Sequence, residues 1–297
     1  MPTTATQDSQ ELQYARPVYL GDLLGELVAD AEDHLRAAAE GRARGPVSGL
    51  RALDHTIGGF FRPGIHGFTG DPGAGKTAVA LQIAGDCGCP AVYVSAEQAP
   101  IELFRKHIAR VTKTPLDTLR DAVPNKIREL ATAAAEKAPS LLILDATSGP
   151  APAVQIEGLA AKLRDRFEAR NVLVVVDALQ PWARGLGTGT EYDLIQAGLS
   201  DLVGITSRLK VPLLLLSHRN RASAGANSTT QTAAKGSADF EHLAESVIHL
   251  AYPKEGGVNA FNPGERTVNV NVAKNRHGPS DLTLDLFFNR ELQSFRG

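Results

Sequence analysis

The sequence of 297 residues predicts an α/β fold with a central, mostly parallel sheet. Two observations lead to this prediction. Short apolar or β-branched runs of strand length alternate with segments whose apolar residues have helical spacing, which is the pattern of a parallel sheet covered on both faces. Near the C-terminus, apolar and polar residues alternate in two further segments, which indicates extra antiparallel strands with one wetter face.

The first 45 residues are expected to form a flexible tail and a linker helix, ahead of one domain over residues 46–297. Residues 1–17 are polar and lack the apolar residues of a packed element. From Leu20 to Leu35 the apolar residues have helical spacing, with Asp22 placed to cap the helix and Gly41 to end it. This amphipathic helix either packs on its own domain or docks on a neighbouring subunit, and the sequence leaves both open.

The elements of the main domain follow in order. The expected parallel strands are 65–69, 91–95, 141–145, 172–177 and 211–217. Helices are expected near 76–86, 99–111, 125–137, 154–169 and 191–210. Residues 222–235 are small and polar, so they interrupt the pattern as a loop, and the alternating segments 268–272 and 282–286 complete the sheet.

Composition excludes several classes of function. The 31 Lys and Arg residues nearly balance 33 Asp and Glu residues, so any contact with nucleic acid must be local. Two cysteines, Cys87 and Cys89, are too close for an ordinary disulfide and too few for a zinc site, which indicates reduced thiols. The sequence has no apolar run of the ~18 residues that a bilayer span requires and no signal peptide. We therefore expect a cytoplasmic protein without a membrane partner.

One segment has the pattern of a phosphate-binding loop, because it follows an apolar strand and opens a helix. Its residues are Gly70, Asp71, Pro72, Gly73, Ala74, Gly75, Lys76 and Thr77. Glycines let successive backbone N–H groups face a phosphate, Lys76 reaches the β- and γ-phosphates, and Thr77 holds Mg²⁺. The segment predicts ATP and Mg²⁺ as cofactors. A glycine turn before a helix is the alternative, and it requires neither the lysine nor the threonine.

Three carboxylates are candidates for the rest of the ATPase chemistry. A second metal residue is expected at the end of a strand beside the phosphate-loop strand. Asp177 and Asp145 both end apolar strands, and we favour Asp177 because residues 172–176 form the more continuously apolar, hence more central, strand. Glu97 lies two residues past strand 91–95, where ligands gather in open α/β sheets, and is the candidate general base. A surface glutamate is the alternative interpretation.

Together these segments resemble the C-terminal ATPase domain of the DnaB-type replicative helicases, a hexameric branch of the RecA-like P-loop fold. The resemblance covers about residues 46–297. Besides the phosphate-binding loop, it rests on five segments in order: Gly49-Leu50-Arg51-Ala52-Leu53-Asp54, Val94-Ser95-Ala96-Glu97, Val176-Asp177-Ala178-Leu179-Gln180, Ser217-His218-Arg219-Asn220-Arg221 and Lys274-Asn275-Arg276-His277-Gly278-Pro279.

The resemblance implies roles for single residues. Glu97 corresponds to the family's catalytic base, and Arg105 matches an arginine of the following helix. Lys274 and Arg276 correspond to the cations that reach a neighbouring subunit's γ-phosphate, and their alternation on a strand directs both to one face. His218 stands where the family usually has a glutamine that senses the γ-phosphate. The resemblance further implies single-stranded DNA and copies of the same chain, in a hexameric ring, as partners.

The expected DNA contacts depart from the family's pattern. Residues 222–235 contain no arginine and only Lys235, so the candidate nucleic-acid residues are Arg184, Arg219, Arg221 and Lys235. Trp182 is a candidate for stacking on a base, with packing in the fold as the alternative. The family's N-terminal helical domain has no room in residues 1–45, so we expect a stand-alone motor domain.

Three functions are compatible with these motifs. The favoured one is a ring-forming helicase-type ATPase that moves on single-stranded DNA. A RecA-like recombination mediator that forms filaments and a KaiC-like regulatory ATPase without nucleic acid remain open.

Overall fold

The computed structural model describes residues 17–218, 240–253 and 264–297. The chain separates into two compact units, residues 1–44 and 45–297, and each is described here by itself. No helix of the described ranges combines the length and apolar character that a membrane crossing needs.

The first unit is one helix. A 3-10 turn, η1 (Leu20–Leu23), leads into α1 (Leu24–Glu40), which ends at Gly41 in the left-handed conformation, as expected. The expectation for Asp22 was wrong: it lies inside η1, and the start of α1 has no side-chain cap, because the 3-10 turn supplies the first backbone hydrogen bonds. Asp33 accepts a hydrogen bond from Arg42, at 2.9 Å, so the chain after the helix folds back onto it.

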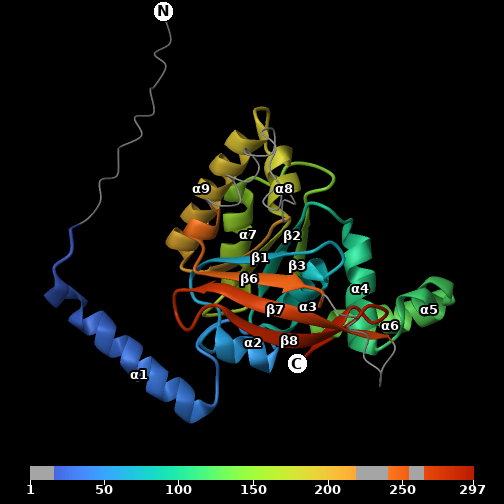
Figure 1. The fold of residues 1–297 in the computed structure, drawn as a ribbon, viewed down its shortest axis with the longest axis horizontal. Helices are drawn as coiled ribbons and strands as arrows, with labels where there is room; N and C mark the ends of the chain where they lie inside the picture. The colour runs from blue at the N-terminus through green and yellow to red at the C-terminus, as the bar shows by residue number, and fades with distance from the viewer. Residues whose placement is uncertain (1–16, 219–239, 254–263) are drawn as a thin grey trace, which may run out of the picture. The chain divides into compact units, whose positions relative to one another are not determined.

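The second unit is a nine-stranded sheet with helices on both faces (Figure 1). Its strands are β1 (Gly64–Gly70), β2 (Ala91–Ser95), β3 (Leu141–Asp145), β4 (Leu173–Asp177), β5 (Pro212–Leu216), β6 (Ser246–Ala251), β7 (Glu265–Asn275), β8 (Leu282–Asn289) and β9 (Ser294–Arg296). Its helices are α2 (Arg51–Thr56), α3 (Lys76–Asp86), α4 (Pro100–Thr112), α5 (Leu116–Asp121), α6 (Pro124–Lys137), α7 (Ala153–Arg166), α8 (Leu179–Gly185) and α9 (Glu191–Leu209).

The strand order is β3-β2-β4-β5-β1-β6-β7-β8-β9. Strands β1 to β6 pair in parallel, and β7, β8 and β9 continue the sheet antiparallel, so the predicted mostly parallel sheet with antiparallel C-terminal strands is confirmed. The strand ending in Asp177 was expected beside the phosphate-loop strand. Instead β5 lies between them, because β4 pairs with β2 on one side and β5 on the other.

Each face of the sheet has its own apolar core. One contains side chains of α2, α3 and the antiparallel strands, and the other contains side chains of α7, α8 and α9. Figure 1 shows the second group of helices together on one side of the sheet. Because both faces are covered, β2, β4 and β5 are buried along their full length, which explains their continuous apolar sequences.

Gly67 in β1 marks the closest approach between the sheet and the segment that enters β6. Phe240 is fully buried, and a Cβ atom on residue 67 would lie 2.2 Å from its Cζ atom. We expect Gly67→Ala to lower the free energy of unfolding by about 1–3 kcal/mol through overpacking. Urea denaturation measures the loss. Gly149→Ala, where no atom lies within 4 Å of the new methyl group, is the control and should leave the unfolding midpoint nearly unchanged.

Candidate nucleotide-binding site

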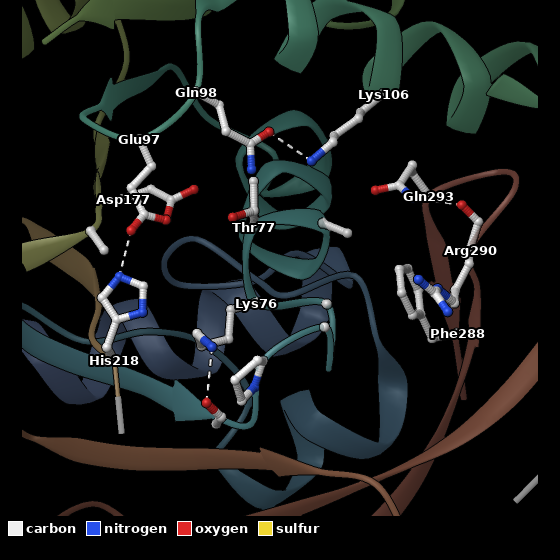
Figure 2. Close-up of a pocket in the computed structure, with 16 residues that line it drawn as sticks. Lys76, Thr77, Glu97, Gln98, Lys106, Asp177, His218, Phe288, Arg290 and Gln293 are labelled. Atoms are coloured by element: carbon white, nitrogen blue, oxygen red, sulfur yellow. Dashed lines mark hydrogen bonds and ion pairs between the residues drawn. The ribbon is translucent and has the colours of Figure 1, made fainter. Parts of the chain in front are cut away.

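A cavity of about 360 Å³ lies at the carboxyl ends of β1, β2 and β4. Parallel strands bring these ends to one edge of the sheet, so loops that are far apart in sequence meet there. Figure 2 shows the labelled residues that line the cavity: Lys76, Thr77, Glu97, Gln98, Lys106, Asp177, His218, Phe288, Arg290 and Gln293.

The phosphate-binding loop joins β1 to α3. At two of its glycines, a side chain would collide with a neighbouring strand. Gly70 has φ +156°, and a Cβ atom there would lie 2.3 Å from the carbonyl oxygen of Leu250 in β6. Gly75 has φ +91°, and its Cβ atom would lie 2.7 Å from the ring of Phe295 in β9. The loop is therefore shaped by backbone freedom and by two neighbouring strands.

Further contacts fix the loop from outside. The hydroxyl of Tyr252 donates a hydrogen bond to the carbonyl of Gly73. The side-chain amide of Gln82 in α3 both donates to the Phe295 carbonyl, at 3.0 Å, and accepts from the Phe295 backbone N–H, at 2.8 Å. The C-terminal strand is thus joined directly to the helix that follows the loop.

The Lys76 ammonium lies within its own loop. Its Nζ atom donates to the carbonyls of Gly70, at 2.9 Å, and Asp71, at 3.3 Å. Burial lowers the pKa of Lys76, and the nearby carboxylates of Glu97 and Asp177 oppose this shift. A phosphate at the loop would replace carbonyl contacts with a charge-assisted hydrogen bond, which is the stronger interaction.

Thr77 and Asp177 fit a divalent cation. Asp177 is only 2% exposed, and burial raises its pKa, while hydrogen bonds from Tyr93 and Thr77 lower it. The Tyr93 hydroxyl donates to Asp177 Oδ2 at 2.6 Å. Among the described residues, hydroxyl groups hydrogen-bond this buried carboxylate, and Lys106 lowers its pKa through its charge alone. Mg²⁺ would add a directly bound compensating charge, as it does in this class of site. Thr77 and Asp177 would hold that ion together with phosphate oxygens of a nucleotide.

Glu97 and His218 form an ion pair on one side of the cavity (Figure 2). The hydrogen bond from His218 lowers the pKa of Glu97, and the same bond raises the pKa of His218. The contribution of Glu97 to stability is lost as the pH falls through its lowered pKa, and that of His218 is lost as the pH rises through its raised pKa. Both groups are therefore charged at pH values between the pKa of Glu97 and the pKa of His218. Glu97 is then an ionised carboxylate whose partner, His218, can be exchanged for water.

Gln180 positions His218. Its side-chain nitrogen donates to the Ser217 hydroxyl at 2.8 Å, and its carbonyl oxygen accepts from the His218 backbone N–H at 3.3 Å. The end of β5 is thereby tied to the segment that follows Asp177. This explains why a glutamine three residues after the metal residue belongs to the site.

The helix α4 directs Lys106 into the cavity. Lys106 Nζ donates to Gln98 Oε1 at 2.7 Å, whereas Arg105, expected at the site, pairs with Glu102 and does not line the cavity. One residue along a helix is a rotation of about 100°, so neighbouring side chains point in different directions. Leu103 and His107 are buried and fix which face of α4 is turned toward the protein. That face would have favoured Lys106 over Arg105 as the residue at the cavity.

The antiparallel strands contribute a wall that the sequence analysis did not include. Phe288, Arg290 and Gln293 line the cavity opposite Glu97 and His218 (Figure 2). Phe288 stacks on Phe295 with ring centroids 4.4 Å apart. Their aromatic and cationic character was visible in the sequence, but nothing in the pattern connected β8 to the phosphate-binding loop.

Several other expected residues lie away from the cavity. Asp145 is at the end of the edge strand β3, where its carboxylate accepts hydrogen bonds from Thr147. Trp182 is 1% exposed and its Nε1 atom donates to the Ala151 carbonyl at 2.9 Å, so it packs in the fold, as the alternative interpretation had it, and is not placed to stack on a base. Arg184 has a side chain that is 60% exposed, with Glu191 at 3.9 Å. Arg219, Arg221 and Lys235 lie outside the described residues.

Lys274 and Arg276 lie toward the amino ends of the parallel strands, away from the phosphate-binding loop. Because β7 runs antiparallel to β6, Lys274 pairs with Val247, which is level with Gly67. Arg276 is further back: its backbone N–H donates to the Glu245 carbonyl at 2.9 Å, and the Glu245 N–H donates to the Ile65 carbonyl. Five residues of β1 separate that level from Gly70, which is about 16 Å. The two cations cannot reach the loop of their own chain.

Known proteins are similar to this chain. It is 24% identical over 303 residues to the replicative DNA helicase DnaB of Treponema pallidum, covering 98% of this chain and 65% of that protein. It is 24% identical over 251 residues to the DNA repair protein RadA of Mycobacterium tuberculosis, covering 81% of this chain and 41% of RadA. The chain thus spans less than two thirds of the length of either curated relative.

Two solved structures share the fold. A DnaB-like replicative helicase, solved in a study of its interactions with primase, has a TM-score of 0.72 at 21% identity, covering 95% of this chain and 67% of that chain. A separately solved ATPase domain has a TM-score of 0.74 at 22% identity, covering 92% of this chain and 98% of that domain.

The structural likeness confirms the RecA-like fold, with the loop, Asp177 and Glu97 at the carboxyl edge of its parallel strands. The family model for the DnaB-like helicase C-terminal domain matches residues 45–297. By this match, the chain belongs to the DnaB-like helicase C-terminal domain family.

Proposed function

We propose that the chain is one subunit of a ring-forming, helicase-type motor that binds single-stranded DNA and hydrolyses ATP at subunit interfaces. One observation carries this proposal. Arg276 matches one of the family's transition-state cations, but its backbone lies at a level about 16 Å from the phosphate-binding loop of its own chain. Lys274 matches the other cation and is level with Gly67, three residues of β1 before the loop. A complete site then requires the loop of one subunit and the cations of the next.

In the proposed reaction, the chain itself supplies binding, orientation and proton transfer. Backbone N–H groups of the loop and Lys76 hold the β- and γ-phosphates of ATP. Mg²⁺, when bound, neutralises charge on those phosphates, and Thr77 and Asp177 are the residues that hold it. Glu97 orients the attacking water and accepts its proton. Arg276 of the neighbouring copy stabilises the negative charge that develops on the transferred group.

In the proposed mechanism, His218 couples nucleotide binding to the segment that follows β5. Its ion pair with Glu97 occupies the carboxylate that must bind water, so water and His218 compete for the same oxygen. An imidazolium N–H can also donate a hydrogen bond to an oxygen of the γ-phosphate. We infer that His218 exchanges Glu97 for the γ-phosphate when ATP binds, and releases the base at that moment.

The DNA contacts are proposed to come from Arg184, Arg219, Arg221 and Lys235. Support comes from the family and from DNA helicase and DNA repair proteins among the relatives. Arg184 is exposed on α8, and its charge adds to the hydrogen bond from His218 in lowering the pKa of Glu97. A DNA phosphate bound to Arg184 would offset its charge. The pKa of Glu97, the proposed base, would then rise.

The proposed function is tested by ATP turnover with and without single-stranded DNA, forked-duplex unwinding, and negative-stain microscopy with an ATP analogue and Mg²⁺. We expect DNA-stimulated turnover, unwinding and rings. Stimulation with filaments and no unwinding would favour the recombination role that the RadA similarity suggests. ATP turnover that does not change when single-stranded DNA is added would favour a regulatory ATPase.

Substitutions of Glu97 and Asp177 should impair different steps, turnover in the first case and nucleotide binding in the second. We expect Glu97→Gln to retain nucleotide affinity and lose about 10²–10⁴-fold in turnover, since the amide holds water but accepts no proton. Asp177→Asn should instead weaken Mg²⁺-dependent nucleotide binding, because it removes the buried charge. Calorimetric titration with and without Mg²⁺, beside steady-state turnover, separates the two effects. The reverse pattern would exchange the two assignments.

Mixed subunits test the split site. Arg276→Ala should bind ATP normally and lose on the order of 10³-fold or more in turnover, as the loss of an arginine finger does. Lys76→Ala should be inactive for lack of its loop cation. When the two variants are mixed, interfaces that pair an intact loop with an intact Arg276 are complete, so part of the activity should return.

The double variant Lys76→Ala/Arg276→Ala is the control for mixing. Mixed with Arg276→Ala, it forms no complete interface and should restore nothing. If the complementing mixture stays as inactive as its parents although the chains co-assemble, the assignment of Arg276 to the neighbouring site is wrong.

A further inference from the structure

Glu245 contacts Arg276 and His277, at the turn that follows β7, through both its backbone and its side chain. Its carboxylate accepts a hydrogen bond from Arg276 Nη1 at 3.0 Å, and its other oxygen lies 2.9 Å from His277 Nε2. The Glu245 carbonyl accepts from the Arg276 backbone N–H, at 2.9 Å, and the Glu245 N–H donates to the Ile65 carbonyl, at 2.7 Å. One residue thus links β1 to the backbone and the side chain of Arg276.

The position of Glu245 is itself fixed by packing. Its side chain is 18% exposed and lies against Gly64 of β1. A Cβ atom on residue 64 would lie 2.4 Å from Glu245 Cγ, so the glycine provides the space that the glutamate occupies. Gly64 has φ +128°, a backbone conformation that L side chains rarely adopt. The carboxylate therefore has a defined place relative to the sheet.

Backbone carbonyls complete the support. Lys274 Nζ donates to the carbonyls of Glu241 and His242, at 2.8 and 2.9 Å, and Arg276 Nη2 donates to the same His242 carbonyl at 3.1 Å. Both cations therefore converge on one short segment, as expected for side chains on one face. Two positive charges this close repel each other, and the Glu245 carboxylate offsets that repulsion.

Arg276 keeps free donors in this arrangement. A guanidinium has five N–H donors, and within the part of the chain that the structure describes, the side-chain contacts of Arg276 with Glu245 and His242 use two of them. Its side chain is 50% exposed, so the remaining donors have access to a phosphate of another chain. Glu245 therefore restrains the guanidinium without blocking it.

We propose that Glu245 is a positioning residue that holds Arg276 in the orientation required by the neighbouring subunit's γ-phosphate. This inference rests on the proposed function, because it assigns Glu245 to a site that only the assembled chains complete. A flexible arginine would have to be ordered in each catalytic cycle. The fixed carboxylate orders it beforehand, and errors of about 1 Å in such placement reduce rates by about 10²-fold.

Glu245→Gln is the test variant, because it keeps the size of the side chain and removes its charge. We expect kcat to fall about 10–100-fold while KM for ATP stays within about twofold, since the loop that binds ATP lies at the other edge of the sheet. Glu157→Gln is the matched control. Glu157 is 23% exposed and also accepts two hydrogen bonds from an arginine, Arg208, but between α7 and α9. Its kcat should remain that of the unaltered protein.

Mixing gives a readout that a merely structural role would not move. Glu245→Gln has an intact loop and Lys76→Ala has an intact Glu245, so a mixture of the two should regain activity well above the sum of its parts. If Arg276→Ala is rescued by Lys76→Ala but Glu245→Gln is not, Glu245 affects the nucleotide site of its own chain and not that of the neighbour, and this inference is wrong. If neither is rescued, the proposed split site fails first.

Two outcomes remain decisive if Glu245→Gln is unstable. Glu245→Asp keeps the charge but shortens the side chain, so it should lower kcat less than Glu245→Gln at matched folded fraction, measured by circular dichroism. A kcat above that of the unaltered protein for either variant would show that Glu245 restrains Arg276 away from the neighbour, and would overturn the proposal.

Discussion

The parallel pairing of β1, β2, β4 and β5 is the constraint that places every chemical group of this chain. Parallel strands present all their carboxyl ends at one edge, so the phosphate-binding loop, Glu97, Asp177 and His218 meet there without any direct sequence connection. Strand β7 runs in the opposite direction, so the residues that follow it lie at the other edge. The position of Arg276 is therefore a result of strand direction, and the separation of the two half-sites follows from the sheet itself.

The antiparallel strands serve both edges. At one edge they close the nucleotide cavity, where Phe288 stacks on Phe295 and Gln82 binds the backbone of β9. At the other edge, β7 ends in the turn that Glu245 supports. In the proposed ring, the C-terminal part of the sheet would connect the nucleotide cavity of one subunit with the cations that it offers to the next.

The sequence was most informative where a motif and an element boundary coincide. The loop glycines, the strand that ends in Asp177 and the helix from Lys76 were predictable, because backbone conformation, burial and chemistry all constrain those positions. The continuous apolar run 172–176 correctly indicated that β4 is more central than β3, which lies at an edge. The place of β5 between β4 and β1 was not predictable, because no sequence pattern states which strands pair. Lys106 was missed in favour of Arg105, because similarity of residue type does not fix the phase of a helix. Trp182 was ambiguous for the reason that an indole suits a core as well as a base.

The bond between Gln82 and Phe295 has a consequence for how the protein is made. These residues are separated by 213 positions, and the ring of Phe295 is also the neighbour that shapes Gly75 in the phosphate-binding loop. A ribosome therefore synthesises the loop long before the strand that supports it. Until that strand emerges, a nascent chain has the nucleotide motif without one wall of its cavity. Nucleotide binding is thus postponed until nearly the whole domain has left the ribosome, so a partly made subunit is poorly equipped to hold ATP.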